Sequence, residues 1–154
     1  ASVGLARLGS FVGHGSGEIM IGFSTAHSVR YDEEQVQQLE VMPEGKIDLA
    51  FRAIAECGGT IGLNYSAGFI SPDIPSHTSR IDDMVRHMKH LYQVGGIECM
   101  ALGGDLDGIR GDLEIDSTDK TLWLLERLKK EGFTESQIDK IAYDNMFRLI
   151  GETL

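Results

Sequence analysis

Apolar residues in this chain fall into short continuous runs and longer stripes with helical spacing. A short continuous apolar run is typical of a strand buried on both faces. Apolar residues three and four positions apart indicate the buried side of a helix. Strands are therefore predicted at residues 19–23, 60–65 and 98–103. Helices are predicted at residues 46–57, 79–95, 117–131, 134–142 and 144–150. Residues 1–18 are rich in Gly and Ser and predict irregular structure.

Capping residues support several of these boundaries. Gly58 follows the first helix as a carboxyl-terminal glycine cap would. Thr78 or Ser79 is the expected amino-terminal cap of the second helix. Thr134 with Gln137 three residues later has the pattern of a capping box. The apolar pattern and the capping residues thus predict the same order of elements.

Strands that alternate with helices predict an α/β fold with right-handed βαβ crossovers and a parallel sheet. A complete (β/α)8 barrel of the TIM type typically needs about 250 residues, and this chain has 154 residues with three clear strands. The prediction is a single partial domain of parallel βα units, about half a barrel. No linker or shift in composition marks a boundary within it.

Charge and cysteine content narrow the possible partners and compartment. The formal net charge is -10, which argues against nucleic acid as a partner. No apolar run approaches the roughly 20 residues that span a bilayer. Cys57 and Cys99 lie in apolar surroundings that read as core, which favours a reduced compartment, and the start of the chain lacks a convincing signal-peptide layout. These features favour a cytoplasmic location, but the sequence does not establish the location or decide whether the protein associates with a membrane.

Polar side chains follow the three predicted strands. His27 comes after the first, Asn64 and Tyr65 end the second, and Asp105 follows Gly104 after the third. The carboxyl ends of parallel strands share one rim, where α/β proteins keep their active sites. A neutral imidazole suits Zn²⁺, and a carboxylate can accept a proton from metal-bound water. The alternatives are a hydrogen-bonded His27 and a plain acidic turn at Asp105.

Two other histidines, His87 and His90, lie three residues apart on one predicted helix. They could in principle share a metal ion. Their helix connects two strands and belongs to the outer layer, far from the rim. We therefore interpret both as solvated or capping residues.

Three segments in order resemble the carboxyl-terminal half of the renal (membrane) dipeptidase family: GGTIGLNYSAGFI, TSRIDDMVRHMKHLYQVGGIECMALGGDLDGI and LLERLKKEGFTESQIDKIAYDNMFRLI. The resemblance covers residues 46–154, and residues 1–45 match poorly. It implies a (β/α)8 barrel that hydrolyses dipeptides with two zinc ions, and in some members tolerates D-residues at the carboxyl end.

The resemblance also implies roles for individual residues. Asp105 matches the catalytic aspartate, and His27, in TAHS, matches a zinc ligand. Asn64, Tyr65 and Phe69 then become candidates for substrate binding. The family's remaining metal ligands, a His-x-Asp pair, a bridging Glu and a second His, have no counterpart in this sequence.

The family's substrate-binding arginine is also missing, and the segment before Pro43 instead carries Glu40. Arg30 is a possible substitute for the arginine.

The expected function is zinc-dependent dipeptide hydrolysis by the complete protein, with this chain as one part of it. Two alternatives remain open: a non-catalytic barrel fragment or subunit, and another amidohydrolase-type barrel hydrolase. The missing barrel half or a second copy is the expected partner, because open sheet edges need covering. Of the two neighbouring acids, we expect Asp105 to handle protons and Asp107 to support an Asx-type turn.

Overall fold

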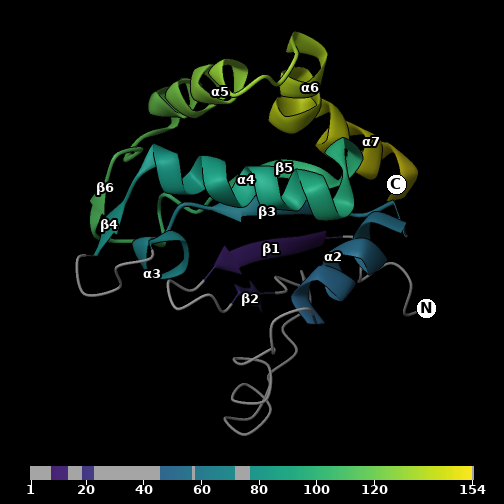
Figure 1. Cartoon of the computed structure of the whole chain (residues 1–154), viewed down its shortest axis with the longest axis horizontal. Coiled ribbons are helices and arrows are strands. Elements are labelled where there is room, and N and C mark those ends of the chain that lie inside the picture. Colours follow the sequence, from purple (N-terminus) through teal and green to yellow (C-terminus); the bar gives the residue numbers. More distant parts are fainter. Residues whose placement is uncertain (1–7, 14–18, 23–45, 57, 72–76, 154) are drawn as a thin grey trace, which may run out of the picture.

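A four-stranded mixed sheet forms the centre of the protein (Figure 1). The computed structural model describes residues 8–13, 19–22, 46–56, 58–71 and 77–153. The strand order is β2-β1-β3-β5, with β1 at Leu8–Gly13, β2 at Ile19–Gly22, β3 at Thr60–Asn64 and β5 at Met100–Gly104. β1, β3 and β5 are parallel, and β2 is antiparallel to β1.

The strand predicted at residues 19–23 is present as β2, but two features near it differ from the prediction. Residues 8–13 form β1, where irregular structure was expected, and β2 is antiparallel where an all-parallel sheet was expected. Only residues 14–18 separate these two strands. A parallel connection needs a dozen or more residues, so the short link forces an antiparallel pair. The Gly- and Ser-containing sequence of β1 did not predict a strand. The strand forms because β2 and β3 pair with it.

β3 and β5 pair very closely near their carboxyl ends. A Cβ on Gly103 would lie 2.9 Å from the Gly62 carbonyl carbon, so only glycine fits there at this strand separation. The register shifts between Leu63 and Asn64, which places Asn64 opposite Gly104. This irregularity sets the position of the two side chains that follow on the rim.

The helices predicted at residues 46–57 and 79–95 are both present and pack against the sheet. α2 spans Lys46–Glu56 and α4 spans Ile81–Gly95, and the two pack against each other. Phe51 on α2 and the apolar side of α4 are fully buried against the strands. In Figure 1, α4 runs across the front of the sheet. The short helix α3, Ala67–Ile70, follows β3.

A small second sheet was not predicted. β4, Thr78–Ser79, pairs in parallel with β6, Asp112–Leu113. The expected capping role of Thr78 or Ser79 is wrong, because these residues are extended and Arg80 is the residue before α4. The Ile81 N–H donates instead to Glu114 Oε2 at 2.8 Å. A carboxylate distant in sequence thus satisfies one of the free N–H groups of α4.

The carboxyl-terminal helices lie on the β5 side of the sheet. Their bounds are η4 Thr118–Lys120, α5 Thr121–Lys130, α6 Glu135–Asp139, the π-helical turn η5 Lys140–Asp144, and α7 Asn145–Thr153. A further short helix, η3 Ile97–Cys99, lies between α4 and β5. The predicted capping box between Thr134 and Gln137 is confirmed. The helical spacing of Leu122, Leu125 and Leu128 predicts that they lie on the buried side of α5. Leu124 and Leu128 are buried, whereas Leu122 is 63% exposed, so the prediction is wrong for Leu122. No helix in the described ranges is long and apolar enough to cross a membrane.

Candidate functional site

The carboxyl ends of β3 and β5 bring Asn64 and Asp105 together. Asn64 Nδ2 donates to Asp105 Oδ2 at 2.9 Å, and Asn64 Oδ1 accepts from the Ser66 N–H at 2.8 Å. Because a backbone donor occupies Asn64 Oδ1, the amide nitrogen must face the carboxylate. Asn64 is buried, and Asp105 is exposed. The expected convergence of these two strand ends is therefore confirmed.

A tight turn after β5 presents the Asp105 carboxylate. Asp105 has a φ of +66°, which is uncommon for a residue with a side chain and is concentrated at functional sites. Its carbonyl oxygen accepts from the Gly108 N–H at 3.0 Å and from the Ile109 N–H at 3.2 Å. A Cβ at Gly108 would lie 2.6 Å from Asp105 Oδ1. Glycine at 108 therefore leaves the room that the carboxylate occupies.

Asp107 does not close the turn. The sequence predicted a turn at residues 107–108 supported by the Asp107 carboxylate, but the Asp105 carbonyl accepts the turn hydrogen bonds. Asp107 is exposed, and within the described ranges its carboxylate has no hydrogen bond. Asp105 thus lies at the strand ends as expected, whereas Asp107 lacks the structural role that we predicted.

A pocket of about 480 Å³ opens beside Asp105. Its lining includes Tyr65, Leu102, Leu106 and Thr121. Tyr65 is 1% exposed, and burial raises the pKa of its phenol to about 12. The nearby Thr121 side chain partly offsets this rise in pKa, although the Tyr65 hydroxyl has no hydrogen-bond partner among the described residues. The pocket therefore joins a neutral tyrosine and two leucines to two carboxylates, those of Asp105 and Asp107.

Of the other candidate site residues, one lies in the described part of the chain and two lie outside it. Phe69 lies on α3, directly after β3, and is partly buried. His27 and Arg30 lie outside the described residues. The roles of all three stay predictions.

A metal ion would need more ligands than the described rim offers. Among the described residues, no three His, Cys, Asp or Glu side chains converge as ligands would. Asp105 is the carboxylate at the strand ends, and one of its oxygens already accepts from Asn64. Zinc sites in enzymes have at least three protein ligands. The described side chains therefore do not fit a zinc ion by themselves.

His87 and His90 do not share a site. His87 Nε2 lies 3.2 Å from the Ile70 carbonyl oxygen, and His90 Nε2 lies 2.8 Å from Asp48 Oδ1 on α2. Burial lowers the pKa of His87 to about 4. Each imidazole thus ties α4 to a different neighbouring segment.

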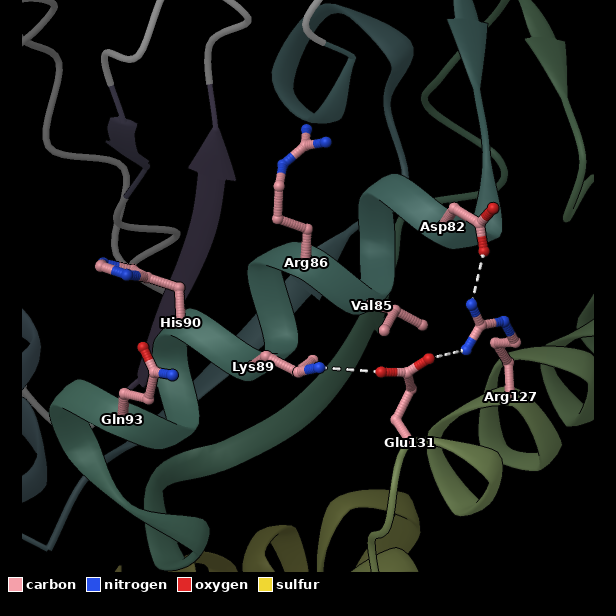
Figure 2. A pocket seen from close by; sticks show the side chains of 8 residues that line it. All are labelled: Asp82, Val85, Arg86, Lys89, His90, Gln93, Arg127 and Glu131. Carbon is pink, nitrogen blue, oxygen red and sulfur yellow. Dashed lines mark hydrogen bonds and ion pairs between the residues drawn. The ribbon is translucent and has the colours of Figure 1, made fainter.

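A second hollow, of about 440 Å³, lies between α4 and α5. Figure 2 shows the side chains that line it. Glu131 sits between two cations: Lys89 Nζ is 2.8 Å away, and Arg127 pairs with its other oxygen. Hydrogen bonds from Lys89 and then Arg127 hold the pKa of Glu131 at about 2. Arg127 also lies 3.1 Å from Asp82 on α4. These opposite charges are matched within the hollow and join the two helices, which indicates a structural network.

The Asn-x-x-Arg motif of α7 is also structural. The side chain of Asn145, 1% exposed, donates to the carbonyl oxygens of Ile97 at 2.7 Å and Met100 at 2.8 Å. Arg148 donates to the carbonyl oxygens of Gly58 at 2.8 Å and Glu98 at 3.1 Å. These bonds fasten α7 to the chain segments that lead into β3 and β5, at the opposite end of the strands from Asp105.

Comparisons with known proteins identify the class. The family model described as membrane dipeptidase (peptidase family M19) matches residues 47–154. The chain therefore belongs to the membrane dipeptidase family M19, whose members are metallopeptidases. A model of peptidase family S58 matches residues 1–60, less than half of the chain. His27 and Arg30 precede the M19 match, so that match does not support their predicted roles.

This chain covers less than half of the length of each similar protein described here. An uncharacterized protein in the pqqA 5' region of Klebsiella pneumoniae is 28% identical over 70% of this chain and 40% of its own length. A crystallised metallopeptidase from Rhodobacter sphaeroides, liganded with a phosphinate mimic of the dipeptide L-Ala-D-Ala, is 25% identical with a TM-score of 0.64. That similarity covers 70% of this chain and 31% of the Rhodobacter chain.

Two further solved structures show a similar fold. The dipeptidase AC of family M19 has a TM-score of 0.63 at 24% identity, and the comparison covers 69% of this chain and 32% of that one. An amidohydrolase from Pseudomonas aeruginosa has a TM-score of 0.56 at 21% identity, over 69% of this chain and 39% of that one. This chain thus spans about a third to two fifths of the proteins that it matches.

Proposed function

We propose that this chain forms the carboxyl-terminal part of a zinc-dependent dipeptidase with a (β/α)8 barrel. Residues 46–154 would be the dipeptidase-like unit, and residues 1–45 a segment of separate character that adds β1 and β2 to the sheet. The parallel order of β1, β3 and β5 and the family match support this proposal. The observation that carries it is the Asp105 carboxylate, oriented by Asn64 at the carboxyl ends of adjacent parallel strands.

Asp105 would act as the proton-handling group. Asn64 fixes one carboxylate oxygen, and the turn to Gly108 fixes the backbone, so the remaining lone pairs point to a defined place. A carboxylate held in this way can take a proton from an attacking water and return it to the departing amine of a dipeptide. Because the carboxylate is already oriented, less entropy is lost when it and the reacting groups come into position.

The pocket beside Asp105 suits a small, partly apolar substrate. Leu102 and Leu106 supply apolar contact, and a dipeptide is the substrate class that the ligand of the Rhodobacter relative suggests. Asn64, Tyr65 and Phe69 are the proposed binding residues on β3 and the segment after it. Arg30 is the proposed partner of the substrate carboxylate.

The zinc ions would be held largely by side chains from outside the described part of the chain. His27 is the proposed contribution of this chain, and the other ligands would come from the part of the family fold that this chain does not span.

Release of D-Ala from L-Ala-D-Ala tests the assignment in an active assembly that contains this chain. We expect Asp105→Asn to lower kcat by about 10²–10⁴, the usual contribution of a general acid or base. Asp107→Asn is the matched control, because it makes the same change two residues away on an exposed side chain. If the assembly is folded and Asp105→Asn keeps full activity while Asp107→Asn abolishes it, the roles are reversed. A folded assembly that hydrolyses no dipeptide would support the non-catalytic alternative.

A further inference from the structure

The hydroxyl group of Tyr65 is a buried polar group that the fold does not use. Tyr65 is 1% exposed, and among the described residues its hydroxyl has no hydrogen-bond partner. Most buried polar atoms in proteins are paired, because leaving one unpaired is unfavourable. A phenylalanine would fill the same space without an unpaired oxygen, so the fold alone does not account for a tyrosine at this position.

The Tyr65 side chain extends between two walls of the pocket beside Asp105. Its Cε2 atom lies 3.9 Å from the position that a Cβ on Gly104 would occupy. The Thr121 side chain lies close enough to the phenol to affect its pKa. Gly104, at the end of β5, and Thr121, at the start of α5, both line the pocket. The hydroxyl is therefore directed into the pocket, where a ligand can supply its missing partner.

The rest of the lining suits a cation on an aliphatic stem. Asp105 and Asp107 are exposed carboxylates, and the lining contributed by the described residues contains no Lys, Arg or His side chain. Leu102 and Leu106, both partly buried, add apolar surface to the same lining. A lysine side chain packs its methylene stem along apolar surface and keeps its ammonium group among polar atoms. The volume of about 480 Å³ is large enough for such a side chain.

We propose that this pocket binds the basic side chain of one residue of a dipeptide, and that the Tyr65 hydroxyl selects for it. The stem of the basic side chain lies on Leu102 and Leu106. Its ammonium group donates to the Tyr65 oxygen, in the field of the two carboxylates. The proposal rests on the proposed function, because it treats the pocket as part of a dipeptide site. It extends that function by naming the preferred substrate class, a dipeptide that contains lysine or a similar basic residue.

Binding of L-lysinamide to the full 154-residue chain tests the pocket without requiring hydrolysis. L-Norleucinamide is the matched probe, because it has the same carbon stem and lacks the side-chain ammonium group. A titration followed by amide NMR shifts measures both dissociation constants and locates the site. We expect lysinamide to bind about tenfold more tightly or better, with shifts at residues 102–107 and 118–121, because a charge-assisted hydrogen bond is added. Equal affinities of the two probes, or no saturable shift with lysinamide, would overturn the proposal.

Tyr65→Phe separates recognition from a structural role. The variant should reduce the preference for lysinamide about tenfold or more, and it should not lower the urea midpoint, because it removes a buried hydroxyl without a partner. Tyr143→Phe is the matched control, since it removes the same oxygen from a side chain that is 47% exposed on η5. The control should keep the preference. A preference that survives Tyr65→Phe, or a urea midpoint that falls in this variant, contradicts the proposed role of the hydroxyl.

Kinetics of an active assembly that contains this chain separate this proposal from the proposed function. The substrates are L-Ala-D-Ala analogues in which lysine or norleucine replaces one of the two residues. At one of the two positions, kcat/KM should be about tenfold or more higher for lysine than for norleucine. Hydrolysis without a preference at either position overturns the substrate class and leaves the proposed function intact. A folded assembly that prefers lysinamide but cleaves no dipeptide retains the pocket and removes the proposed function.

Discussion

His87 should make folding stability fall as the pH drops below neutral. Its ring nitrogen Nε2 lies 3.2 Å from the Ile70 carbonyl oxygen, which can only accept, so the imidazole donates. Burial is the main reason that its pKa falls to about 4, and the Ile70 hydrogen bond opposes that shift. Of the nearby charges, Arg86 and His90 lower the pKa and Asp83 raises it. The neutral imidazole is therefore the form that the fold stabilises.

The size of the effect follows from the two pKa values. In the unfolded chain the His87 pKa is about 6.5, so the unfolded state binds this proton first as the pH falls. Stability is therefore lost between about pH 6.5 and pH 4, and the contribution is fully present above pH 7. With a folded pKa of about 4, the loss between pH 7.5 and pH 5 is about 2 kcal/mol.

Urea unfolding at pH 7.5 and pH 5.0 measures this loss in the wild type and in His87→Gln. Glutamine keeps an N–H donor for the Ile70 carbonyl and does not titrate. We expect the wild type to lose about 2 kcal/mol more than the variant over this interval. Carboxylates titrate equally in both proteins and cancel in the difference. Identical pH dependence of the two proteins would refute the explanation.

Three further results are expected. Asn145→Leu should lower the unfolding free energy by roughly 2–4 kcal/mol, because the Ile97 and Met100 carbonyls lose their donor; chemical denaturation measures the change. Gly108→Ala should displace the Asp105 carboxylate and lower dipeptidase activity of an active assembly at least tenfold, with less than about 1 kcal/mol lost in stability, and unchanged kcat/KM would contradict the crowding argument. Dialysis of the isolated chain against a weak chelator should leave well below two zinc equivalents by metal analysis, and two tightly held ions would disprove this expectation.

Local patterns in the sequence predicted the elements that local chemistry determines. The stripe of α4, the capping box at Thr134 and the buried run of β3 are all readable within one segment. β1 was missed because its Gly- and Ser-containing sequence becomes a strand only through its pairing partners. β4 was missed for a related reason, since its two residues are extended only because β6 pairs with them.

The candidate site was partly predictable in the same way. The strand end and the two glycines before Asp105 gave its position, and parallel order predicted that Asn64 would be near. The sequence could not show that Gly108 makes room for the carboxylate, because that contact depends on the left-handed conformation of Asp105. The exposure of Leu122 was equally hidden, because helical spacing defines a side of α5 but not how far the core extends.

Residues 105–114 form a loop that starts at the candidate catalytic residue Asp105, and the Glu114 contact links this loop to the start of α4. The loop begins at the Asp105 turn, and its far end is held by the β4–β6 pairing and by the Ile81 N–H bond to Glu114. Both ends are therefore anchored to rigid elements, so the loop has little freedom to swing as a lid. Opening it at the Glu114 end would strip a hydrogen-bond acceptor from the first turn of α4. Loop motion and fraying of α4 should consequently occur as one event, with a single exchange rate.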